Sequence, residues 1–208
     1  RPFLFLTFSL SGSSATSWYT KMKYVRPATL FKKLINMNRR TLAEGIDTRL
    51  LGLDVCDNCV GFAFSEFSNI LSRGLMRLKI NEMDLVTQHI PPFVSQQNVI
   101  GIVVGKPFVP SELKEDPNEM QVRKFISDLR NTRKFEGLEY TFWCDVFALK
   151  HLKSSAIGSP QHESDSRVKE MAAVMTLQGF QERKRLNENE LKLRLGNEAL
   201  VSACVVGI

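Results

Sequence analysis

The stretch from Leu50 to Glu66, LLGLDVCDNCVGFAFSE, carries two kinds of group that could do chemistry. Asp54 interrupts an apolar run, and Cys56 and Cys59 follow it at Cys-x-x-Cys spacing. An ionised carboxylate is expensive in a buried strand unless it faces a metal ion, a cation or hydrogen-bond donors. We therefore expect Asp54 either to bind a metal ion or to cap the backbone amides of the turn that follows it.

The cysteine pair offers a zinc site or a redox site as competing interpretations. A zinc site needs two further ligands, but Cys144, Cys204 and three scattered histidines include no second pair at metal spacing. A redox pair normally has its first cysteine at a helix N-terminus, whereas this pair spans a turn between two predicted strands. We interpret Cys56 and Cys59 as small, partly buried residues of a hairpin in a protein of a reducing compartment.

Five strands are predicted around these residues. RLLGLDV and CVGFAFS flank the turn, and a third strand lies within NILSRGLMRLKI. The unbroken β-branched run VIGIVVG is typical of a strand that is buried on both faces, and LEYTFWC supplies the fifth strand.

Helices are predicted between and after the later strands. Pro91 and Pro92 belong in a first turn, which places one helix start near Ile90. Asp116, Pro117 and Glu119 give an N-cap, a first-turn proline and a capping-box acid for the next helix. A short helix is expected within VFALKHLKS. A last one is expected within SDSRVKEMAAVMTLQGFQERKRL, with Val168, Met171, Ala172 and Met175 on one face.

The formal net charge of +6 is unevenly distributed along the 208 residues. Residues 1–43 contain eight Lys and Arg and no acid, which leaves 20 basic against 22 acidic residues afterwards. Any basic binding surface must therefore be a local patch. The lead has the composition of an organelle transit peptide, with an untidy gene boundary and a start at Met22 as the alternative. No apolar run approaches the roughly 20 residues of a membrane span, so we expect a soluble protein. Because the cysteines favour a reducing compartment, we expect it to be intracellular, in the cytoplasm, a plastid or a mitochondrion.

Four motifs, LLGLDVCDNCVGFAFS, GIVVGKPF, YTFWCD and AAVMTLQGF, resemble the YqgF/RuvX family in order and spacing. That family comprises proteins described as Holliday junction resolvases or pre-16S rRNA nucleases, and MKYVRP is similar to its plant members. The resemblance implies an α/β, ribonuclease H-like fold: a five-stranded mixed sheet of order 3-2-1-4-5, flanked by helices. We assign residues 46–183 to this domain, residues 1–45 to a basic lead and residues 184–208 to a C-terminal extension.

The resemblance also implies a metal site. Family members are expected to hold a divalent ion, one Mg²⁺ or Mn²⁺, with acids from the first strand, the end of the fifth strand and the last helix, and to cleave phosphodiesters with activated water. Asp54 matches the first acid and Asp145 the second. Lys169 stands where the family has the third, and Asp165, one turn earlier, either partly substitutes or pairs with the lysine. An inward ammonium about 4 Å from another unit cation costs about 4 kcal/mol at an effective dielectric of 20, so Lys169 should weaken metal binding.

For contact with nucleic acid we name Lys106, Arg123, Lys124 and Lys169, against the alternative that they are ordinary solvated charges. Trp143 could stack on a base but is more often core in a strand. The first hypothesis is a metal-dependent endonuclease of low activity that acts on structured RNA or branched DNA. The second is a non-catalytic nucleic-acid-binding remnant in which Lys169 replaces the metal charge. The third is a diverged or mis-spliced product that folds poorly. The oligomeric state is not predicted.

Overall fold

A computed structural model describes residues 21–44, 47–56, 58–66, 69–107, 116–144 and 171–189, with side chains of the first range described to residue 37. The short helix expected within residues 146–154 lies outside this part of the chain.

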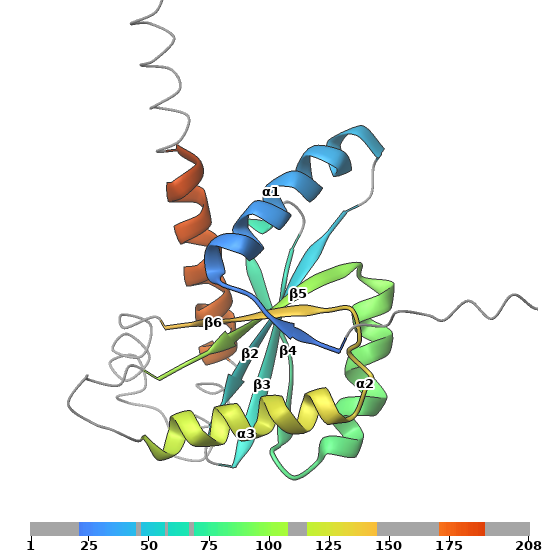
Figure 1. The fold of residues 1–208 in the computed structure, drawn as a ribbon, viewed down its shortest axis with the longest axis vertical. Coiled ribbons are helices and arrows are strands. Elements are labelled where there is room, and N and C mark those ends of the chain that lie inside the picture. Colours follow the sequence, from blue (N-terminus) through green and yellow to red (C-terminus); the bar gives the residue numbers. More distant parts are fainter. Residues whose placement is uncertain are drawn as a thin grey trace, which may run out of the picture.

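A six-stranded mixed sheet forms the centre of the fold (Figure 1). Its order is β1-β6-β5-β2-β3-β4. The strands β2, β5, β6 and β1 run parallel to one another where they pair, whereas β3 is antiparallel to both β2 and β4. The strands are β1 Lys23–Tyr24, β2 Arg49–Val55, β3 Cys59–Ser65, β4 Ser72–Lys79, β5 Val99–Gly105 and β6 Glu139–Trp143. The predicted order 3-2-1-4-5 is confirmed as β4-β3-β2-β5-β6, and with it the α/β, ribonuclease H-like class. The two-residue β1 is an additional edge strand.

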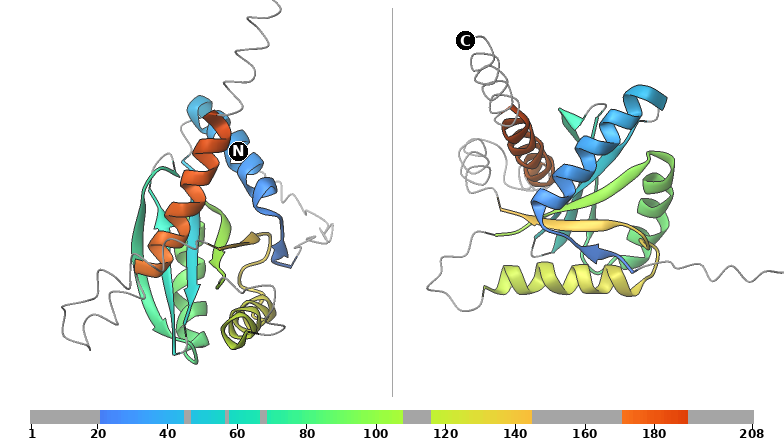
Figure 2. Two further views of the ribbon diagram at one scale, coloured as in Figure 1. Left: turned by 90° about the vertical axis from the view of Figure 1, so that its left-hand side faces the viewer. Right: turned by 45° about the horizontal axis from the view of Figure 1, so that its top comes forward.

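Helices cover both faces of the sheet. In the right-hand view of Figure 2, α1 (Pro27–Glu44) and the helix of residues 171–189 lie above the sheet, and α3 (Pro117–Asn131) lies below it. Alternate residues of β2 serve the two faces. Leu51 and Leu53 join the core on the α3 side, and Leu50 joins the core that α1 shares with residues 171–189. No helix in the described residues has the length and apolar character needed to cross a membrane.

The described part of the basic lead packs against the sheet. Met22, Leu30 and Leu34 are almost fully buried. Leu30 and Leu34 belong to an apolar stripe at helical spacing within the positively charged α1, whereas Met22 precedes β1 and packs into the other core. The amide of Val25 donates to Tyr140 O at 2.8 Å, which ties β1 to β6. The elements β1 and α1 therefore contribute to the core, although the domain boundary expected after residue 45 places them outside the domain.

The prediction that a helix starts near Ile90 is wrong. The helix α2 spans Met83–Gln96 and holds Pro91 and Pro92 in its interior. Each proline removes one helical hydrogen bond. Val86 and Ile90 are fully buried against the sheet, and this apolar packing offsets the loss.

The helix α3 begins as predicted, with Asp116 as its N-cap. The Asp116 carboxylate accepts from the amides of Asn118 and Glu119 at 2.7 and 3.4 Å. The predicted capping box is not completed, because the Glu119 carboxylate is bonded to two cationic side chains instead.

The helix of residues 171–189 rests directly on β2. A Cβ added at Gly52 would lie 2.8 Å from Leu177 Cβ and 2.9 Å from Ala173 O, so glycine permits this close approach. Ala173, Leu177 and Phe180 are fully buried. Met171, which the spacing places on the same helix face as Ala172, is 49% exposed. The helix continues past the expected boundary at residue 184.

Candidate active site

The candidate site lies where the parallel strands β2, β5 and β6 end at one edge of the sheet. Leu53 pairs with Val104, so the next residue of each strand, Asp54 and Gly105, are level with each other. Gly105 in turn pairs with Trp143 at the end of β6. The register therefore places the Asp54 carboxylate at the carboxyl edge of the sheet, where open α/β sheets bind ligands.

The Asp54 side chain points to the face that the helix of residues 171–189 covers. A Cβ added at Gly105 would lie 2.5 Å from Asp54 Oδ1 and 3.0 Å from Thr176 Oγ1. Any side chain at position 105 would therefore displace the carboxylate. Glycine gives Asp54 its space, and Thr176, which is buried, closes the other side of that space.

The Asp54 carboxyl has an unusual protonation equilibrium. Burial raises its pKa from 3.8 to about 6, and a hydrogen bond from the Cys56 thiol to Asp54 Oδ2, at 3.2 Å, opposes part of this rise. Within the described residues, no cationic side chain and no backbone amide bonds this carboxylate. The expectation that Asp54 caps turn amides is thus not met by any described amide. A partly buried carboxylate without a protein cation favours the binding of a metal cation.

The cysteines lie at the two ends of the turn between β2 and β3. The amide of Cys56 donates to Cys59 O at 2.8 Å, and the Gln121 amide donates to Cys56 O at 3.4 Å. Both side chains are thiols, and Cys59 is buried. Across the ranges that the structure covers, no three His, Cys, Asp or Glu side chains come together as a metal-binding group.

Of the acids predicted to bind a divalent ion, only Asp54 lies in the described residues, so the fit of the ion can be judged at this one ligand. Carboxylate oxygens are the ligands that Mg²⁺ and Mn²⁺ prefer, and Asp54 offers one at the expected strand end. Asp145 follows the last residue of β6 by two positions. Asp145, Asp165 and Lys169 all lie outside the described residues. Asp54 fits the role, and the other two acids stay predictions.

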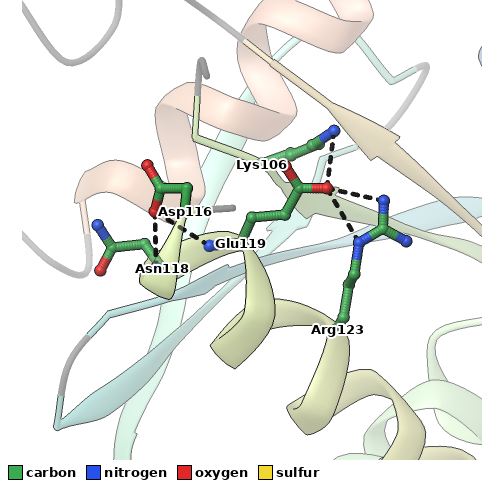
Figure 3. A network of polar contacts seen from close by, with 5 residues as sticks. All are labelled: Lys106, Asp116, Asn118, Glu119 and Arg123. Carbon is green, nitrogen blue, oxygen red and sulfur yellow. Dashed lines mark hydrogen bonds and ion pairs between the residues drawn. The ribbon is translucent and has the colours of Figure 1, made fainter. Parts of the chain in front are cut away.

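A second cluster, at the start of α3, contains two of the predicted phosphate ligands (Figure 3). The Glu119 carboxylate lies 3.0 Å from Lys106 Nζ and 2.7 Å from an Arg123 guanidinium nitrogen. Hydrogen bonds from Lys106 and then from Arg123 lower the pKa of the Glu119 carboxyl. The guanidinium also lies over the Phe142 ring, 5.6 Å from its centroid. Glu119 was not predicted to bind them, and it neutralises one of their two charges.

The third predicted cation of α3 lies elsewhere. Lys124 is exposed and lines a hollow of about 480 Å³ together with Ile80, Met83 and Asp128. The structure thus brings Lys106 and Arg123 together but does not bring Lys124 to them.

Trp143 belongs to the core between α1 and the helix of residues 171–189. Its ring meets Phe31 at a centroid distance of 6.2 Å and Phe180 at 5.4 Å, both edge to face. The alternative in which Trp143 is a core residue explains these contacts, and a stacking platform for a base does not.

Comparison with known proteins gives a consistent set of similarities. Residues 48–183 match the RuvX family, which is described as Holliday junction resolvase. A Bacillus mycoides (strain KBAB4) protein named "Putative pre-16S rRNA nuclease" is 32% identical over 136 residues, covering 64% of this chain and 96% of the relative. A protein of the same name from Bacillus cereus (strain B4264) is 32% identical over 140 residues, covering 65% and 99%. The solved structure of T. thermophilus RuvC in complex with Holliday junction substrate has a TM-score of 0.38 at 10% identity, covering 65% of this chain and 95% of that one.

Proposed function

The chain belongs to the RuvX family of nucleases, and from that premise we propose that it is a divalent-metal-dependent endonuclease acting on structured nucleic acid. One observation carries the proposal. The Asp54 side chain is partly buried at the carboxyl end of β2, with its carboxylate in a space left by Gly105 and without a cationic partner in the described residues. That is the setting in which a carboxylate binds a metal ion.

Different residues of this chain would bind the metal ion, position the carboxylate and supply positive charge in the proposed reaction. Asp54 and Asp145 would hold one Mg²⁺ or Mn²⁺, with Asp165 as a further candidate, and a bound ion would supply Lewis-acid activation of water and of the scissile phosphate. Asp54 must be ionised to serve, which its pKa of about 6 allows at neutral pH. Gly105 and Thr176 fix the carboxylate, and Lys106 and Arg123 supply positive charge at the start of α3.

The first experiment is a cleavage assay. The full chain should cleave a labelled rRNA precursor or a four-way DNA junction in Mn²⁺, and Asp54→Asn should lose at least about 100-fold of this rate. Asp128→Asn, which removes an exposed carboxylate of α3, is the matched control and should keep the activity. Undiminished cleavage by the Asp54 variant would refute the assignment. The relatives' names favour the RNA substrate, and the parallel junction assay decides between RNA and DNA.

We further propose that catalysis is impaired by Lys169, which precedes the buried Ala173 by four positions in the sequence. Positions four apart share one face of a helix. The second candidate function, a nucleic-acid-binding remnant that holds phosphate without cutting it, rests on the same lysine. Cleavage by the wild type separates the two, because only an enzyme cleaves before any substitution, whereas Lys169→Asp should raise metal affinity and cleavage in either case. Wild-type cleavage above the background of the Asp54 variant would exclude the remnant.

A further inference from the structure

A row of residues crosses the sheet at the level of Asp54. Asp54 pairs with Gly61 on β3, and Gly61 pairs with Arg77 on β4. Directly paired residues project to the same face of a sheet, so Arg77 lies on the face that carries Asp54. Gly61 has no side chain, and so the sheet places none between the carboxylate and the guanidinium.

The packing of β4 confirms which face this is. Met76 and Leu78, the neighbours of Arg77 in the strand, pack into the core on the α3 side. Arg77 and Lys79 therefore project to the opposite face. Ser72 projects there too, because its hydroxyl donates to Gln181 on the helix of residues 171–189 at 2.7 Å.

The distance between Asp54 and Arg77, and the positive charge of Arg77, suit a ligand that both residues contact. Two strand spacings separate Arg77 from Asp54, about 10 Å between backbones, which a long arginine side chain and a bound phosphate can span together. Arg77 and Lys79 are exposed, and in the described residues no carboxylate forms an ion pair with either. The cations at the start of α3 differ in this respect, because Lys106 and Arg123 share Glu119.

Another arginine of the same strand provides the contrast. Arg73 pairs with Phe64, on the face opposite to Asp54, and forms an ion pair with Glu66. Charged residues also protect edge strands such as β4 from pairing with other chains. That role would apply equally to Arg73 and Arg77. Comparing variants of the two arginines therefore distinguishes edge protection from ligand binding.

We propose that Arg77 and Lys79 form a phosphate-binding surface that holds the nucleic-acid backbone beside Asp54. This proposal rests on the proposed function and assigns the β4 edge as the side from which the substrate backbone approaches. An arginine presents a planar fork to two phosphate oxygens, and a lysine adds a point charge.

The experiment measures binding without cleavage. A fluorescently labelled RNA stem-loop and a four-way DNA junction are titrated with the full chain in Ca²⁺ over a series of salt concentrations. Arg77→Ala should weaken binding about fivefold and make the salt slope shallower by about one unit, and the double variant with Lys79→Ala by about two. Arg73→Ala is the control, and Arg77→Lys should recover the slope because it keeps the charge. Thermal unfolding of each variant checks the fold.

Equal effects of Arg73→Ala and Arg77→Ala, or unchanged slopes in the double variant, would overturn the phosphate-binding surface. Failure of the proposed function looks different. In that case the wild type does not cleave in Mg²⁺ or Mn²⁺, while the double variant still binds more weakly. Conversely, Asp54-dependent cleavage with normal binding by the double variant would retain the nuclease and reject this surface alone.

Discussion

At the scale of single residues, the main feature is a carboxylate that the fold makes costly to ionise. Burial raises the pKa of Asp54 to about 6, and the Cys56 thiol only partly opposes this. A structural role would be better served by an asparagine, which carries no charge to bury. A cation bound to the carboxylate during function would compensate the cost of ionising it in this position.

The pKa of Asp54 predicts a specific dependence of stability on pH. Below pH 3.8 the carboxyl is protonated in both the folded and the unfolded chain, so burial adds no charge cost. Between pH 3.8 and about 6 the unfolded chain ionises first, and the free energy of unfolding falls as the pH rises. Above about pH 6 the full cost, about 3 kcal/mol, is present.

Asp54→Asn should therefore unfold at higher urea concentration than the wild type at pH 7.5 in EDTA, and at nearly the same concentration at pH 3.5. Asp128→Asn, an exposed carboxylate, should show no such difference. A variant that is less stable than the wild type at pH 7.5 would show that the ionised Asp54 stabilises the fold.

At the scale of elements, two glycines on neighbouring strands hold the helix of residues 171–189 and the candidate site in place. An added Cβ at Gly52 would meet the backbone of the helix, whereas one at Gly105 would meet the end of the Asp54 side chain. A flexible side chain can rotate away at little cost, but a packed helix cannot.

Gly52→Ala should therefore mainly lower the stability of the fold, whereas Gly105→Ala should mainly lower the cleavage activity. Gly52→Ala should lower the free energy of unfolding by about 1–3 kcal/mol. Gly105→Ala should change stability less but reduce cleavage at least about tenfold, because the carboxylate moves. Urea unfolding and the cleavage assay on both variants test this. Loss of stability without loss of activity in Gly105→Ala would contradict the placement of Asp54.

The α3 cluster makes a further prediction about charge. Glu119→Gln should release one net positive charge at Lys106 and Arg123, and steepen the salt dependence of nucleic-acid binding by about one unit. Fluorescence anisotropy across a salt series measures this slope. An unchanged slope would place both cations away from the bound backbone.

At the scale of the whole molecule, the two cores use segments that are distant in the sequence. The helix α1 and residues 171–189 meet over one face of the sheet, where Phe31 and Phe180 lie 4.5 Å apart between ring centroids. Phe180 and Leu34 belong to the same buried cluster. The domain therefore depends on residues that precede the matched family segment, residues 48–183.

A chain that begins at residue 46 should be much less stable than one that begins at residue 22. It would lose the buried side chains of Met22, Leu30, Phe31 and Leu34, which together contribute roughly 5 kcal/mol or more. Thermal unfolding of the two chains, with the same C-terminus, measures the difference. Equal melting temperatures would mean that α1 is dispensable to the core.

The sequence predicted the strands well, because alternation and β-branched runs report burial directly. The bounds of β2, β3 and β5 agree with the segments quoted from the sequence. The helix α1 was missed because charges mask its apolar stripe, and α2 was shortened because local proline chemistry competed with tertiary packing. Rules based on neighbouring residues cannot include the stability that a helix gains by packing on strands from distant parts of the chain.

For the site, the sequence singled out Asp54 but not what surrounds it. An isolated acid in a buried strand is a strong local signal. Gly105 and Thr176 come to Asp54 only through strand register and helix packing, and Arg77 comes level with it only through the register of β2, β3 and β4. The pairing of Lys106 and Arg123 on Glu119 joins a loop to a helix. Only the Glu119–Arg123 spacing of four residues is visible in the sequence.

The central claim is that Asp54 binds a divalent cation, and calorimetric titration with Mn²⁺ tests it most directly. The wild type should bind Mn²⁺ saturably at one site at pH 7.5, and Asp54→Asn should bind at least about tenfold more weakly while Asp128→Asn binds as the wild type does. Equal Mn²⁺ binding by the wild type and Asp54→Asn, or none by either, would contradict the account.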